Sequence, residues 1–121
     1  MIKGLLVGES LRTGAELNVA LHVEKIWRVE TASATAGQPS SWTLIQFTAP
    51  DAEAERLAAA LSGCLSPTGG WYADFSTDAE KFVVFADRVF RYPQGDTAGQ
   101  AEAKAYGRSA GVPEPQLDWG D

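Results

Sequence analysis

The hydrophobic and polar positions of this chain first follow a period of two, which is the pattern of β-strands. The apolar run of residues 2–7 predicts a short strand, and residues 20–31 predict a longer one. In the longer stretch polar side chains share one parity, and four large apolar side chains share the other: Leu21, Val23, Trp27 and Val29. We therefore expect residues 20–31 to form a strand with one face in water.

The next two segments predict a loop and a third strand. Residues 31–41 are small and polar and contain glycine and proline, so we expect a flexible hairpin loop there. Residues 42–48 alternate again, but both parities are apolar. The two sets are Trp42 with Leu44 and Ile45 with Phe47.

The period then changes to three to four residues, which is the spacing of an amphipathic helix. Thr48 and Asp51 have the spacing of a capping box, and Pro50 suits a first helical turn, so a helix should begin here. Its apolar stripe contains Ala54, Leu57, Ala58, Leu61 and Leu65, and the sequence SPTGG of residues 66–70 ends it. A second helix is predicted from Thr97, in another capping box, to Gly111.

The segments WYADF (71–75) and KFVVFADRVFRY (81–92) are apolar on both strand faces. A two-residue turn, at Ala86–Asp87 or at Asp87–Arg88, gives the same partition of the second segment. One face receives Val83, Phe85, Phe90 and Tyr92, and the other receives Phe82, Val84, Ala86 and Val89. In the first segment, alternation places Trp71, Ala73 and Phe75 on the core side and Tyr72 and Asp74 on the other.

In chain order these elements predict an α+β two-layer sandwich, with a largely antiparallel sheet and two helices in a single domain of residues 1–121. From residue 20 onward the order resembles a permuted ferredoxin-like fold. If both helices cover one face of the sheet, the apolar hairpin needs another cover on the second face. That cover is the first strand, the tail of residues 112–121, a second copy of the chain or a ligand. We expect a closed homodimer first.

Charge narrows the range of partners. Sixteen acidic residues against ten basic ones give a formal charge of −6, which repels phosphate backbones and anionic lipid surfaces. We therefore expect no nucleic-acid and no membrane partner. The N-terminal segment lacks the apolar run of a secretory signal, and the one cysteine cannot form an internal disulfide, which together favour a cytoplasmic protein.

The candidate chemistry gathers near the first of the two-sided apolar segments. Tyr72 and Asp74 share a strand face, and Lys81, Arg88 or Arg91 of a neighbouring strand can bring a cation within reach. A phenol, a carboxylate and a cation can bind small anions and move protons. The same residues also form ordinary surface pairs of a sheet, and we favour that structural interpretation.

Other reactive side chains carry weaker signals. His22 is the only histidine, which leaves no multi-histidine metal site, and its wet strand face favours a surface role over that of a general base. Cys64 lies beside the apolar helical stripe, which favours a structural thiol over a nucleophile. Segments 8–14 and 51–55 lack the spacing of a phosphate loop and of a calcium loop. We expect neither a metal nor a cofactor.

The segments WYADF, VVF, RVF, AYG and GVPEPQLDW, with ESL near the start and WTL in the middle, resemble a widespread family of short bacterial proteins of unknown function. The resemblance spans nearly the whole chain. It implies a compact single domain and transfers no catalytic residue. Ala86 and the loop around Gly37 and Pro39 depart from the family pattern, so we expect neither in a shared site.

No catalytic set stands out, so the leading hypothesis is a non-catalytic binding or regulatory module that self-associates and engages a small molecule or a partner protein. The alternative is a small enzyme acting on a polar or anionic metabolite. In that hypothesis Tyr72, Asp74 and His22 are the acid or base candidates, and Arg88 or Arg91 holds the anion. A third hypothesis is a local nucleic-acid contact through the basic residues of the hairpin.

Overall fold

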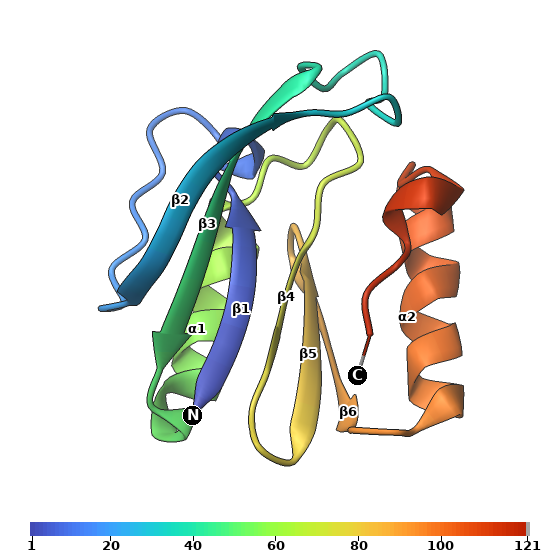
Figure 1. Ribbon diagram of the computed structural model, residues 1–121. Helices are drawn as coiled ribbons and strands as arrows, with labels where there is room; N and C mark the ends of the chain where they lie inside the picture. The colour runs from blue at the N-terminus through green and yellow to red at the C-terminus, as the bar shows by residue number, and fades with distance from the viewer. Residues whose placement is uncertain (121) are drawn as a thin grey trace.

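The computed structural model describes residues 1–120 and contains one six-stranded sheet with two α-helices (Figure 1). The strands are β1 (Ile2–Val7), β2 (His22–Glu30), β3 (Ser41–Ala49), β4 (Ala73–Ser76), β5 (Glu80–Phe85) and β6 (Arg88–Pro93). The α-helices are α1 (Ala54–Cys64) and α2 (Thr97–Ser109), and the 3-10 turns are η1 (Gly8–Ser10), η2 (Asp51–Glu53) and η3 (Glu114–Gln116). The predicted α+β class is confirmed. The last residue of the predicted tail, Asp121, lies outside the described residues.

The strand order is β2-β3-β1-β4-β5-β6, and every neighbouring pair is antiparallel. The first strand of the chain therefore lies inside the sheet, between β3 and β4. Since both of those strands run antiparallel to β1, the path from β3 through α1 to β4 is a split β-α-β unit. In a ferredoxin-like fold a later strand takes this inner position, so the resemblance in element order does not extend to the sheet.

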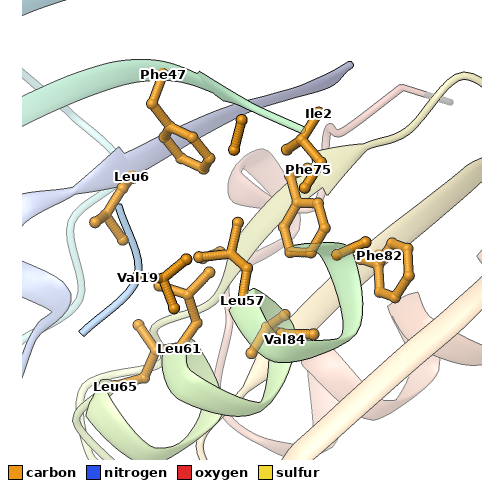
Figure 2. Close-up of a cluster of buried hydrophobic side chains, with 14 residues drawn as sticks. Ile2, Leu6, Val19, Phe47, Leu57, Leu61, Leu65, Phe75, Phe82 and Val84 are labelled. Carbon is orange, nitrogen blue, oxygen red and sulfur yellow. The ribbon is translucent and has the colours of Figure 1, made fainter. Parts of the chain in front are cut away.

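Helix α1 packs on one face of the sheet and forms the larger hydrophobic core, as Figure 2 shows. All five residues of the predicted stripe are buried there. From the sheet they meet Ile2, Leu6, Phe47, Ala49, Ala73, Phe75, Phe82 and Val84. The rings of Phe75 and Phe82 stack with centroids 4.8 Å apart. A Cβ on Gly4 would collide with Phe47 and Phe75, so only glycine lets these two phenyl side chains close over β1.

The β5–β6 hairpin is apolar on both faces, and each face has its own cover. Phe85 pairs with Arg88 across a two-residue turn, which confirms the predicted partition of its side chains. Phe82 and Val84 belong to the α1 core, whereas Val83 belongs to a second core with α2 and the tail (residues 112–120). The complete second core is Val83, Phe85, Phe90, Tyr92, Ala103, Val112, Leu117 and Trp119.

The two helices therefore lie on opposite faces of the sheet, and the expectation that they share one face is wrong. Helix α2 follows β6, the edge strand, and passes to the face that α1 leaves free (Figure 1). Gly107 makes this close packing possible, because a Cβ there would press against Leu117. The second face of the hairpin is covered by the chain's own tail, so this face no longer supports a dimer.

The helix starts differ from the predicted capping boxes. Neither Thr48 nor Thr97 caps a helix. Helix α1 follows directly on the 3-10 turn η2 and has no side-chain cap. Helix α2 is capped by Asp96, whose Oδ1 accepts hydrogen bonds from the backbone N–H groups of Ala98 at 3.1 Å and Gly99 at 3.2 Å. A carboxylate at this position also complements the positive end of the helix dipole.

A register shift in β2 changes which of its side chains share a face. The shift lies between Val23 and Lys25, where β2 carries one extra residue. Val23 pairs with Phe47, which faces α1, whereas Trp27 pairs with Leu44, which faces the other way. The expectation that Val23 and Trp27 share a face is therefore wrong, because a bulge reverses the alternation. Its effect is to place Trp27 and Val29 on the face opposite α1.

Candidate functional site

A groove lies on the face of the sheet opposite α1, between the β2–β3–β1 half and the tail. Its volume is about 470 Å³, within the range of small-molecule sites, which is about 300–1,000 Å³. The base is formed by Leu5, Val7 and Leu44, and the walls carry Val29, Trp42, Trp71, Tyr72 and Trp119. Leu5 remains 40% exposed. We call this surface the groove. The tail lines one side of it, and no residue of α2 does.

Trp71 was expected in a core beside Ala73 and Phe75. It is buried, with 7% exposure, but it does not belong to their cluster under α1. Strand β4 begins only at Ala73, so the alternation of a strand does not apply to residue 71. Two glycines with positive φ, Gly69 at 96° and Gly70 at 74°, turn the chain just before it. Trp71 lies instead in the groove wall, with its ring centroid 5.3 Å from that of Trp42. The two indoles form the wall that faces the β2–β3 end of the sheet.

Tyr72 fixes the opposite wall. Its hydroxyl donates a hydrogen bond to the backbone carbonyl of Gln116, and its ring packs edge-on against Trp119 with centroids 5.0 Å apart. Burial raises the pKa of this hydroxyl well above its usual value, and the carboxylates of Asp74 and Asp118 raise it further. Tyr72 is therefore a neutral phenol that holds the tail in place.

Asp74 and Lys81 form an ion pair beside Tyr72, with 2.6 Å between Lys81 Nζ and Asp74 Oδ2. The lysine side chain is only 5% exposed, and the aspartate side chain is 26% exposed at the edge of the groove. The structure thus brings together the predicted phenol, carboxylate and cation. The ammonium group, however, is nearly buried and paired with Asp74, so it is not available to a ligand.

The two arginines proposed for the site lie elsewhere. Arg91 pairs with Glu80 at 2.7 Å and with Glu55 of α1 at 2.6 Å, on the face opposite the groove. Arg88 lies over the ring of Phe90, with its guanidinium carbon 4.6 Å from the centroid. Neither lines the groove, so they do not join Lys81 in a basic cluster.

His22 lies at the other end of β2 from the groove and is exposed. It borders a shallow hollow with Met1 and Pro50, whereas Tyr72 and Asp74 line the groove. Cys64 is buried, and its thiol donates to the backbone carbonyl of Glu16 at 3.3 Å. This position fits a structural thiol.

A buried pair of amide side chains, which the sequence pattern did not reveal, joins the 31–41 loop to the tail. Gln116 Nε2 donates to Gln38 Oε1 at 2.9 Å and to the carbonyl of Ser33 at 2.8 Å. Gln38 Nε2 donates in return to Gln116 Oε1 at 3.4 Å. The loop that we expected to be flexible is therefore anchored. The two glutamines are 78 residues apart, so no local spacing could have signalled the contact.

The groove is acidic. Its charged lining residues are Glu30, Asp74 and Asp118, and no lysine, arginine or histidine among residues 1–120 lines it. Asp74 is balanced by Lys81, whereas Glu30 and Asp118 make no ion pair within the described part of the chain. The wall aromatics and these two carboxylates are the groups that a ligand would meet.

Comparisons with known proteins give the chain no relatives. No family model matches it, and neither a search of curated proteins nor a search of solved structures finds a match. Within residues 1–120 there is no group of three or more metal-binding side chains. Neither helix in the described part of the chain has the length and apolarity needed to cross a membrane.

Proposed function

We propose that this protein is a non-catalytic binding module that takes a small molecule in the groove. The observation that carries the proposal is the groove itself, a concave, largely apolar surface with a few polar groups at its border. Such surfaces are the usual form of small-molecule sites. They cost stability when left wet, because each large apolar side chain in water forgoes about 1.5–3 kcal/mol of burial free energy.

The polar groups of the groove favour binding over catalysis. The Tyr72 hydroxyl donates to Gln116, and the Lys81 ammonium is held by Asp74. A general acid or base needs a proton that it can exchange with a substrate. Both candidates already have protein partners, and the anion-holding arginines of the enzyme hypothesis lie outside the groove. We therefore place the enzyme hypothesis second.

The test is a fragment screen read by two-dimensional amide NMR. Fragments that bind should shift the amide signals of Leu5, Val7 and residues 42–44 on the sheet side and residues 115–119 on the tail side. The variant Trp42→Ala removes one wall, so we expect it to weaken these fragments at least about tenfold. Val89→Ala, on β6 and outside both the groove and the β2 edge, is the matched control. Shifts that map only to the hollow near His22, or no shifts at millimolar fragment, would contradict the proposal.

The proposal includes self-association in the cytoplasm, now through a different surface from the one first expected. Strand β2 is an edge of the sheet, and Val23 and Ile26 on it are 44% and 61% exposed. An edge strand with exposed apolar side chains can pair with a second copy. Light scattering at micromolar concentration should return a dimer mass, and Ile26→Lys should return a monomer mass. A monomer mass for the unaltered protein would remove this part of the proposal.

A further inference from the structure

The charge and the aromatic character of the groove together restrict its ligand. The lining side chains include three carboxylates and no cation among residues 1–120. An anionic ligand would meet uncompensated like charge, which disfavours binding. A cationic ligand would meet Glu30 and Asp118, neither of which is paired within the described chain.

The aromatic rings around the groove already attract cations from the chain itself. The ammonium group of Lys25 lies 4.3 Å from the ring centroid of Trp27, on the same face as the groove. The ammonium group of Lys104 lies 5.5 Å from the ring centroid of Trp119. Cations are drawn to indole faces by the ring quadrupole. Trp42 and Trp71 line the groove and carry no such lysine or arginine within residues 1–120.

The carboxylates locate the charged end of such a ligand. Asp74 and Asp118 both lie near Tyr72, and Asp74 is held by Lys81, so Asp118 is the carboxylate on the tail side that has no ion pair within residues 1–120. In the apolar base, Leu5 pairs with Asp74 of β4, and Val7 pairs with Leu44, which is two residues from Trp42 on β3. The base therefore extends from the carboxylates to the indole wall. An elongated ligand can thus place an apolar body on the base and a positive head near Asp118.

We propose that the groove binds a small organic cation, an ammonium or guanidinium group carried on an apolar or aromatic body. The body packs between Leu44 and the indoles of Trp42 and Trp71, and the head lies near Asp118 and Asp74. A cavity of about 470 Å³ suits a free small molecule of this kind. This inference rests on the proposed function, because it names the ligand class for the same groove.

Three probes with the same phenylethyl body test it: phenethylamine, 2-phenylethanol and 3-phenylpropionate, titrated by amide NMR at low salt. We expect the amine to bind about tenfold more tightly than the alcohol, since the head gains both ion-pair and cation–π attraction, and the carboxylate to bind most weakly. Added salt should reduce the preference for the amine and leave the alcohol unchanged.

Two variants locate the effect. Asp118→Asn should weaken the amine about threefold to fivefold and leave the alcohol unchanged, because only the charged head meets that carboxylate. Glu102→Gln removes an exposed acid of α2 that does not line the groove, and it should change neither affinity. Urea unfolding of both variants shows whether the fold is retained.

The outcomes separate the inference from the proposed function. Equal affinity for the three probes, or tighter binding of the carboxylate, overturns the cation inference and leaves a binding groove. If fragments of another chemical class shift the groove amides and the amine does not, the cation inference is also overturned and the binding groove remains. If no probe and no fragment shifts the groove amides, both the inference and the proposed function fail.

Discussion

The two ends of this sheet use apolar side chains in different ways. At the β5–β6 end every residue from Lys81 to Phe85 is buried, because α1 covers one face and α2 with the tail covers the other. At the β2–β3 end no residue of β2 is buried. At the first end β5 is buried on both faces, although Val89 of β6 remains 37% exposed. The second keeps large side chains such as Trp42 and Leu44 at a surface that the chain does not close.

Connectivity explains this difference. Helix α2 and the tail follow β6 directly, so their apolar side chains reach the nearest uncovered face, which is that of the hairpin. No later segment of residues 1–120 lies over β2. The tail stops at the groove, where Gln116 joins it to the 31–41 loop. The second core and the groove therefore lie side by side, and Trp119 belongs to both.

The largest expected effect sharpens this contrast by truncating one side chain at each end. Phe85 is 2% exposed and packs against Phe90 and Tyr106, so Phe85→Ala should cost about 3–5 kcal/mol of unfolding free energy. Ile26→Ala on β2 should change the stability of the monomer by no more than about 0.5 kcal/mol, because Ile26 is 61% exposed in the single chain. Urea unfolding of both variants in dilute protein, where light scattering returns a monomer mass, gives the comparison. Similar losses at the two ends under those conditions would contradict the contrast between them.

A second prediction concerns the ion pair at the boundary between the two regions. Asp74→Asn leaves the buried ammonium of Lys81 without its counter-charge and should cost about 3 kcal/mol. The double variant with Lys81→Met should recover much of that loss, because no buried charge is left unpaired. A thermodynamic cycle of the two single variants and the double variant measures the coupling. Additive losses would mean that the pair is not coupled, and an unchanged melting temperature for Asp74→Asn would favour the enzyme hypothesis.

A smaller effect is expected at the contact between Tyr72 and the tail. Tyr72→Phe removes the donor to the Gln116 carbonyl and should cost about 1 kcal/mol. Its packing against Trp119 is retained, so the loss should appear as easier opening of the tail. Limited proteolysis would then cleave within residues 112–120 faster than in the unaltered protein. Equal cleavage rates would show that this hydrogen bond does not hold the tail.

The smallest effect lies at the groove end of the sheet and depends on pH. Glu9 Oε1 accepts from the Thr43 N–H at 2.6 Å, and Oε2 accepts from the Thr43 hydroxyl at 2.9 Å. Partial burial raises the pKa of Glu9, but these hydrogen bonds outweigh it, so the folded pKa lies below the usual value of 4.5. The stabilisation is therefore complete above about pH 5 and is lost as pH falls through the lower folded pKa.

Glu9→Gln should accordingly cost about 0.5–1 kcal/mol at pH 7, a modest figure because the carboxylate is partly in water. At pH 3 the difference from the unaltered protein should shrink. Urea unfolding at both pH values measures it. A difference that grows on acidification would reverse the sign and contradict the assignment of these hydrogen bonds.

The sequence was most informative where one local rule applied without interruption. Alternation along residues 81–92 and a two-residue turn sufficed to divide the β5–β6 side chains correctly, and the stripe of α1 followed from its spacing. Alternation failed at Val23 and at Trp71. A bulge lies next to the first, and strand β4 starts two residues after the second. Neither interruption has a clear signature in one sequence.

What could not be predicted depends on contacts between distant segments. That α2 crosses to the face opposite α1 follows from three-dimensional packing around the β6 edge. The groove needs β1, β3 and the tail to meet, and the amide pair joins Gln38 to Gln116 across 78 residues. Tyr72, Asp74 and Lys81 were identified because they are close in sequence. Trp42, Trp119 and Asp118 beside them were not, since they come from other parts of the chain, and Trp71 was assigned to the opposite side because the alternation of a strand was extended past the start of β4.

The shared Trp119 side chain has a thermodynamic consequence. The groove acquires its Trp119 side only after the tail has docked on the hairpin, so any compound that binds there also stabilises the docked tail by an amount that grows with ligand concentration. Hydrogen exchange at Leu117 and Trp119 would then slow when the groove fills. Variants destabilised in the hairpin core, such as Phe85→Ala, would regain part of their lost melting temperature when the ligand is present.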